Sequence, residues 1–273
     1  MHILFMNFIK TTILSLLTIL SIQSINAQDR QFARTYQSTV LPKGSFDIEY
    51  WNTFRTGREY FYNRFDQRLE FEYGVTDKFQ SAFYFNATHK AKGSTDTAFS
   101  GIAKESEFSF SHELKWKLSD PSADKLGFGL YAEYTIASNE IELEGKLLLD
   151  KKTEKNIFAF NLSGEYEIEY EVEKGETEMA KEIKLENNFA YMHMFKPTFG
   201  LGLEIRNHNE IPGGEEWENS ALFAGPTLFW SSGKHFVIFN VLPQWANLAG
   251  ESTPPDLDGH EKIEIRLLVG FGH

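Results

Sequence analysis

The stretch that decides the fold is Phe158-Ala159-Phe160-Asn161-Leu162-Ser163-Gly164-Glu165-Tyr166-Glu167-Ile168-Glu169-Tyr170-Glu171-Val172. Apart from Gly164, its even positions are apolar, and its odd positions from Asn161 to Glu171 are polar. Alternation with a period of two places one row of side chains on each face of a sheet. A helix would spread the same carboxylates around all of its sides. The stretch is therefore predicted to be a strand, and it is longer than the roughly five or six residues usual in soluble sheets.

The same alternation recurs along the chain, for example from Phe108 to Leu118 and from Arg68 to Val75. It predicts about twelve strands. They are expected near residues 45–55, 63–76, 79–88, 104–118, 126–137, 140–150, 156–172, 180–194, 198–208, 220–231, 235–246 and 261–273.

The connections between these strands alternate between short and long. Short turns rich in Asp, Gly, Pro and Ser are expected at 74–78, 119–125, 150–155, 195–197 and 231–234, and long loops at 55–62, 89–103, 173–179, 207–219 and 247–260. One connection, at 138–139, is short where a long loop is due. Short turns at one end and longer loops at the other are typical of outer-membrane barrels. The sequence therefore predicts an all-β protein with one antiparallel, up-and-down transmembrane barrel.

A secreted β-sandwich is the alternative, because it would alternate in the same way. Three features favour the barrel. The outward rows are apolar on nearly every strand, the opposite rows are charged, and aromatic residues gather near strand ends. These aromatic residues are Tyr60-Phe61-Tyr62, Tyr73, Trp116, Trp230 and Trp245. A sandwich would have to hide one of its two faces, whereas a closed barrel satisfies its backbone in lipid and encloses the charges.

The first 27 residues have the parts of a secretory signal. Lys10 precedes an apolar run from Thr12 to Ile22, and Ala27 is a small residue before a polar sequence. We expect cleavage after Ala27, because the run is shorter than the roughly 20 residues of a spanning helix. The expected domains are a signal peptide (1–27), an N-terminal periplasmic segment (28–44) and an outer-membrane barrel (45–273).

Composition excludes several functions. The chain has 27 basic and 39 acidic residues and a net charge of −12, which argues against binding nucleic acid. It has no Cys, so a disulfide framework, a thiolate metal site and a Cys nucleophile are excluded. No Gly-rich phosphate loop opens a helix, and no cofactor is expected.

The signal, Ala33-Arg34-Thr35-Tyr36, Leu41-Pro42-Lys43-Gly44 and the strand-turn-strand from Tyr62 to Asn86 carry a family likeness. In these residues the chain resembles uncharacterised porin or transporter β-barrels of the Gram-negative outer membrane. The resemblance implies residence in outer-membrane lipid and insertion by the barrel-assembly machinery, which reads the C-terminal strand. Such families end on an aromatic residue, where this chain has His273.

With the apolar rows outward, the charged rows line the lumen. The candidates for selectivity are Arg68, Glu70, Glu105, Glu107, Glu113, Glu142, Glu144, Glu165, Glu167, Glu169, Arg206, Glu264 and Arg266. Because carboxylates outnumber cations, the lumen is expected to attract cations and to repel anions. The sequence thus predicts a porin-like channel for small polar solutes, passive or gated. The alternatives are a plugged, non-conducting barrel and a barrel that binds ligands through its long loops.

Enzyme and metal functions have weaker signals. Some outer-membrane barrels are lipases with a His and a Ser on the lipid-facing wall, and His112 is predicted to point outward. Ser109 and Ser111 face the lumen, so we expect no nucleophile within reach of His112 and no enzyme activity. Met192-His193-Met194 has ligands that suit copper, but an aromatic-girdle position near a turn explains both methionines as well. No metal site is therefore expected.

Overall fold

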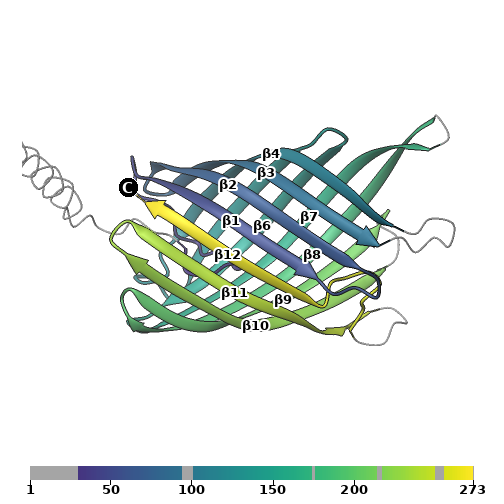
Figure 1. Cartoon of the computed structure of the whole chain (residues 1–273). Helices are drawn as coiled ribbons and strands as arrows, with labels where there is room; N and C mark the ends of the chain where they lie inside the picture. Colours follow the sequence, from purple (N-terminus) through teal and green to yellow (C-terminus); the bar gives the residue numbers. More distant parts are fainter. Residues whose placement is uncertain (1–29, 94–100, 174–175, 214–216, 250–254, 273) are drawn as a thin grey trace, which may run out of the picture.

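The computed structural model describes residues 30–93, 101–173, 176–213, 217–249 and 255–272. They form one closed antiparallel barrel, in which every strand pairs with its neighbours in sequence and β1 pairs with β12 (Figure 1). The twelve strands are β1 (Phe46–Thr56), β2 (Tyr62–Thr76), β3 (Phe79–Gly93), β4 (Ile102–Ser119), β5 (Gly127–Ile136), β6 (Glu140–Lys152), β7 (Asn156–Glu173), β8 (Glu176–Lys196), β9 (Phe199–Pro212), β10 (Asn219–Ser232), β11 (His235–Asn247) and β12 (Ile263–Gly272). The predicted barrel is confirmed, and the sandwich is excluded.

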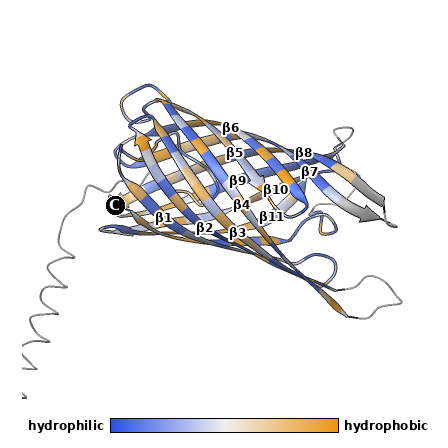
Figure 2. Cartoon of the chain, turned by 90° about the horizontal axis from the view of Figure 1, so that it is seen from above, coloured by the Kyte–Doolittle hydropathy of each residue, from blue (hydrophilic) through white to orange (hydrophobic). Residues whose placement is uncertain are grey.

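The predicted faces of the strands are also confirmed. Along β6, for example, Ile141, Leu143 and Leu147 are exposed on the outside, while Glu142 and Glu144 between them are partly shielded in the lumen. Figure 2 shows the resulting alternation of hydrophobic and hydrophilic positions along the strands. Within the described residues no helix is long and apolar enough to cross a membrane.

Strands extend well into three of the expected long loops. β3 continues to Gly93 and β4 begins at Ile102, so seven of the fifteen residues of the expected loop 89–103 belong to strands, and β9 continues to Pro212 within the expected loop 207–219. β7 ends at Glu173 and β8 begins at Glu176, so five of the seven residues of the loop expected at 173–179 belong to strands. In β3 after Thr88 and in β8 before Ala180, cross-strand pairing continues where the apolar alternation is weak. The β7–β8 hairpin extends beyond its neighbours at the end of the barrel opposite the C-terminus (Figure 1).

One predicted aromatic girdle residue is misplaced. Tyr73, Trp230 and Trp245 are exposed on the outer wall, as expected. Tyr62 is instead buried, and the Arg58 guanidinium lies 4.3 Å from its ring centre. The reason is the register of β2, whose even-numbered residues point into the lumen.

Residues 30–45, here called the N-terminal segment, enter the barrel: residues 30–41 are buried or half-buried, whereas Pro42, Lys43 and Gly44 are exposed beside the turn between β2 and β3. Phe32, Ala33 and Tyr36 of the segment are buried in the main apolar core. The wall contributes inward-facing residues from many strands to this core: Trp51, Tyr131, Leu148, Ile157, Ala159, Ala190, Met192, Phe229, Phe236, Ile238 and Leu268. The half of the lumen toward the short turns is therefore packed with side chains rather than open.

Side chains of the wall bind the backbone of the N-terminal segment. The amides of Ala33, Arg34 and Thr35 all donate to the Glu204 carboxylate of β9, over 3.0, 2.7 and 2.9 Å. Asn161 of β7 accepts from the Tyr36 amide and donates to the Tyr36 carbonyl oxygen, over 2.7 and 2.9 Å. Buried backbone groups need such partners, and here the wall supplies them without adding a strand to the sheet.

The expectations for the signal peptide (1–27) and for His273 concern residues outside the described ranges.

Candidate functional site: a charged cavity in the lumen

Between the N-terminal segment and the long hairpins, the lumen holds a cavity of about 480 Å³. Its walls come from β1 to β9 and β12, and Arg34 and Tyr36 of the N-terminal segment are among its lining residues. Inward-facing residues in this half are polar, whereas those in the other half form the apolar core. The lumen is thus divided into a polar chamber and a packed base.

Most of the residues predicted from the sequence line this cavity. They are Arg68, Glu107, Glu142, Glu144, Glu165, Glu167, Glu169, Arg206 and Arg266. Glu70, Glu113 and Glu264 are fully or almost fully buried and are not among the lining residues. Glu105 is exposed on the outlying part of β4, where it pairs with Lys92 at 4.0 Å.

Carboxylates gather on one side of the cavity. This acidic wall consists of Glu133 of β5, Glu140, Glu142 and Glu144 of β6, and Glu165, Glu167 and Glu169 of β7. Two lysines partly neutralise it: Lys146 lies 2.8 Å from Glu144, and Lys184 contacts Glu165 and Glu167. Because these three strands are consecutive, their inward rows form one continuous surface.

Arginines gather on the opposite side. This arginine wall consists of Arg55 of β1, Arg64 and Arg68 of β2, and Arg266 of β12. In the strand order of the closed barrel, β12 and β1 lie across from β6 and β7. Asp66 bridges Arg55 and Arg64 over 2.9 and 2.5 Å, and the Arg266 guanidinium donates to the carbonyl oxygen of Ala33 over 2.9 Å. The cavity is therefore polarised across its width.

Several lining residues did not emerge from the sequence. Arg55 and Arg64 lie near the ends of β1 and β2, whereas Glu133 lies in the middle of β5, and all three follow the same alternation as the predicted residues. Arg34 could not be predicted in this way, because apolar and polar residues do not alternate regularly in the N-terminal segment. It reaches the site through an ion pair with Glu264, a residue 230 positions away.

Residues 255–262, which precede β12, lie beside one edge of the site, where His260 contacts the lining residue His208. His260 is buried, and its Nε2 lies 2.6 Å from the Asn219 side-chain oxygen. Its ring packs edge-on against His208, with the ring centres 5.5 Å apart. Burial lowers the pKa of His260 to about 4, although nearby Glu210 acts in the opposite direction. His260 is therefore neutral at physiological pH.

The outer wall corrects the expectation about His112. Its Nε2 lies 2.9 Å from the hydroxyl oxygen of Ser81, so a serine is within reach. The sequence did not reveal it, because Ser81 lies on β3 and meets His112 only through the pairing of β3 with β4. The Ser81 backbone is paired with Tyr73 and Leu114 on its two sides, so its N–H group is used by the sheet rather than free for an oxyanion hole. Phe83 stacks on the His112 ring at 4.5 Å.

The structure separates the residues of Met192-His193-Met194. Met192 is fully buried in the lumen core, and Met194 packs against that core. His193 points to the other face, where its Nδ1 lies 3.0 Å from the Asn156 side-chain oxygen. The girdle interpretation of the methionines is therefore wrong, because both face inward. Strand alternation keeps the imidazole away from the two sulfur atoms.

The chain matches the model of a family described as "Family of unknown function (DUF6662)" over residues 24–273. No curated protein matches it. Among solved structures, the COG4313 outer membrane channel from Pseudomonas putida F1 is similar, with a TM-score of 0.61 at 13% identity over 86% of this chain and 98% of that chain. The NanC porin has a TM-score of 0.51 at 9% identity over 82% of this chain and 98% of that chain. At these identities the similarity shows a shared barrel fold.

Proposed function

Because the chain belongs to DUF6662, a family of unknown function, we propose its function from its own geometry: a gated outer-membrane channel for small polar solutes that prefers cations. Two of the structures with this fold are described as an outer membrane channel and a porin, and we carry that class over to this chain.

One observation carries the proposal: a polar chamber lies in the lumen behind a segment that belongs to no strand. The chamber of about 480 Å³ has room for a small solute with some of its water. The N-terminal segment separates it from the short-turn end. Since wall side chains hold this segment, it can move without breaking a single strand pairing. Movement of the segment is the gate that we propose.

The cation preference is modest in this proposal. The cavity is lined by eleven carboxylates and nine lysines and arginines, so its formal charge is −2. The acidic wall offers cations a continuous path, while anions are drawn to the arginine wall across from it. A solute that carries both charges is expected to orient across the cavity.

Purified protein in planar bilayers tests the proposal. We expect discrete conductance steps with brief openings. In a salt gradient, the reversal potential should have the sign of a channel that is more permeable to cations than to anions. If the barrel never conducts at any voltage, the channel proposal is wrong and the non-conducting alternative holds.

The contact between Ser81 and His112 favours a second candidate, a lipid hydrolase. The pair lies next to the tilted rings of Phe79 and Trp116, whose centres are 5.1 Å apart, near the short-turn end of the barrel. Phospholipid hydrolysis by the purified protein tests this candidate, with Ser81→Ala as the control. Because the Ser81 N–H group is engaged in the sheet and cannot stabilise an oxyanion, we expect no turnover. Activity that Ser81→Ala abolishes would replace the channel proposal.

A further inference from the structure

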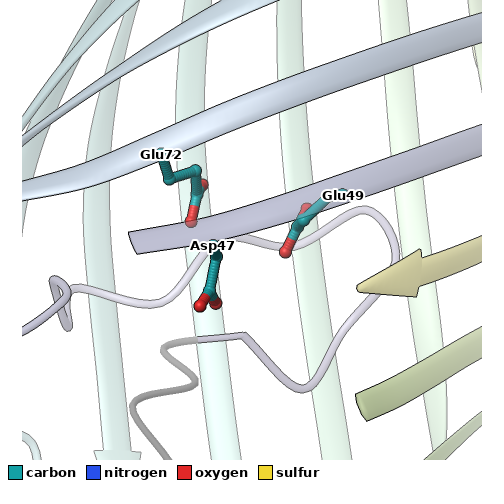
Figure 3. Close-up of side chains that lie close together, drawn as sticks. All are labelled: Asp47, Glu49 and Glu72. Carbon is teal, nitrogen blue, oxygen red and sulfur yellow. The ribbon is translucent and has the colours of Figure 1, made fainter. Parts of the chain in front are cut away.

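Five carboxylates are buried together on β1, β2 and β4, at the edge of the packed base. Asp47, Glu49 and Glu72 form one group whose ligand oxygens lie within 4.8 Å of one another, and Figure 3 shows their side chains on the same side of β1 and β2. Glu70, Glu72 and Glu113 form a second group with the same spacing. The two groups share Glu72, and we call them together the buried carboxylate cluster.

The register of the barrel brings these residues together. Asp47 lies directly across from Glu72, and Glu49 lies directly across from Glu70. Glu113 is on β4, and Ala82 of β3 lies between Glu113 and Glu72 in the register of the sheet. Because alanine is small, Glu113 and Glu72 meet over it. Like charges directly across from each other destabilise a sheet, so something must offset them.

Glu70 and Glu113 are the members that point to a ligand. Both side chains have no exposed surface. Within the described part of the chain, neither carboxylate oxygen of Glu113 has a hydrogen-bond partner, and Glu70 contacts only Glu72, another member of the cluster. Buried charged groups ordinarily have such partners, because losing water without compensation is costly. The Glu113 carboxylate is therefore fully buried, is directed into the cluster and has no hydrogen-bond partner of its own among the described residues.

Protein cations offset only part of the negative charge. The Arg30 guanidinium lies 3.9 Å from both Glu49 and Glu72, and it is held against the rings of Tyr36 and Trp51. Lys115 interacts electrostatically with Glu113, and Arg68 does so with Glu70 while also pairing with Glu133 at 3.6 Å. Five carboxylates against three cations leave an excess of two negative charges.

We propose that Glu70, Glu72 and Glu113 bind one hard divalent cation of the Ca²⁺ type, with Asp47 and Glu49 as its outer neighbours. One such ion neutralises the excess charge. Three carboxylates offer six oxygens, and Ca²⁺ takes about six to eight at roughly 2.3–2.6 Å. Ligands on opposite sides of Ca²⁺ are thus about 5 Å apart, which accommodates oxygens within 4.8 Å of one another. Mg²⁺ needs shorter distances of about 2.0–2.1 Å and keeps its waters, so it fits less well.

The position of the site indicates that the ion has a structural role. Arg30 belongs to the N-terminal segment and contacts the same cluster. A bound ion offsets the repulsion between the carboxylates that face one another across β1, β2 and β4. The ion is therefore expected to stabilise this part of the barrel wall, while Arg30, itself a cation, is attracted less strongly to a cluster that holds the ion.

Metal binding by the full barrel in detergent tests the proposal. After treatment with EDTA and dialysis, we expect one Ca²⁺ per chain and a higher unfolding temperature when Ca²⁺ is returned, with Mg²⁺ much weaker. Tb³⁺ should bind at the same stoichiometry, be displaced by Ca²⁺, and show a luminescence lifetime that indicates few bound waters. A cluster that only shares protons would bind neither ion, and this result would overturn the proposal.

Single substitutions then locate the ion. Glu113→Gln should weaken Ca²⁺ binding about tenfold or more, because it removes one of the charged ligands. Glu107→Gln is the matched control, since Glu107 is on the same strand but lies in the cavity. A competing site exists at Glu140, Glu142 and Glu167, which is less buried. Binding that is lost in Glu142→Gln but kept in Glu113→Gln would overturn the proposal. If Glu113→Gln does not fold, the Tb³⁺ lifetime of the unmodified protein decides between the buried and the cavity site.

Discussion

Gly74 shows how one residue connects the wall to the N-terminal segment. A Cβ atom at this position would lie 2.1 Å from the carbonyl oxygen of Pro42 and 2.6 Å from that of Leu41. The sequence suggested only a turn here, but Gly74 stands at an irregularity in the β2–β3 register, beside the point where the segment joins β1. The backbone amide of Gly44 donates to the Gly74 carbonyl oxygen over 2.8 Å. The absence of a side chain is thus needed for the close approach of two backbones.

We therefore expect Gly74→Ala to displace the N-terminal segment and to destabilise the protein by about 1–3 kcal/mol, as overpacking does. Protease sensitivity of the segment and the free energy of unfolding measure the two effects. Gly145→Ala is the matched control, because its Cβ would meet only the Tyr131 carbonyl oxygen at 3.9 Å. Equal behaviour of the two variants would contradict the role assigned to Gly74.

The lowered pKa of His260 predicts that the folded protein loses stability at acidic pH. Its pKa is about 4 in the folded protein and about 6.5 in the unfolded chain, so the unfolded state binds the additional proton between these values. Stability contributed by neutral His260 is therefore complete above pH 6.5 and falls as the pH drops toward 4. The largest loss that this group can cause is about 3 kcal/mol. Unfolding measured at pH 7.5 and pH 4.5 should show a smaller difference in His260→Gln than in the unmodified chain. An unchanged difference would show that other groups cause the acid sensitivity.

Among the elements, the N-terminal segment differs most from the strands. Each strand is held by backbone pairing on both sides, whereas the segment up to Leu41 is held by wall side chains such as Glu204, Asn161 and Gln80, and only its last residues bond to the backbone of β2. Its apolar residues nevertheless complete the core of the base. This combination makes the segment a specific plug that can detach while the barrel stays intact.

A reversible cross-link tests the segment as a gate. Ser38 Cβ lies 3.2 Å from the position of a Cβ on Gly129 of β5, close to the roughly 3.5–4.5 Å of a disulfide. Because the chain has no Cys, Ser38→Cys with Gly129→Cys creates one defined pair. We expect oxidation to suppress channel openings and a reductant to restore them. Each single variant, given the same oxidant, is the control. Equal conductance before and after oxidation would show that the segment is not the gate.

The elements also show what the sequence could predict. The alternation in β6 and β7 identified their strands, their faces and their inward carboxylates, because a period of two is a local property. β3 and β8 were predicted too short, because β3 after Thr88 and β8 before Ala180 pair with their neighbours where the apolar alternation is weak. The N-terminal segment was not predicted to enter the lumen, because its contacts with Glu204 and Asn161 join residues more than a hundred positions apart. The same limit hid the contact between Ser81 and His112.

At the scale of the whole molecule, the two charged walls matter more than the total charge. The net charge of −12 predicted an acidic lumen, but the cavity has nearly as many cations as carboxylates. What distinguishes it is their separation, with the acidic wall on β5 to β7 and the arginine wall on β12, β1 and β2. Selectivity in this barrel should therefore respond in opposite directions to changes on opposite walls.

Charge-removing substitutions test this arrangement. The pair Glu142→Gln with Glu144→Gln removes two carboxylates and should lower the cation-to-anion permeability ratio by about two- to fivefold. The pair Arg64→Gln with Arg68→Gln should raise it by a similar factor. Reversal potentials in a KCl gradient measure both. Because the Debye length falls from about 10 Å at 0.1 M to about 3 Å at 1 M, both effects should shrink as salt increases. A shift in the same direction for both pairs would mean that ions do not pass between the two walls, and that the cavity is not the conducting path.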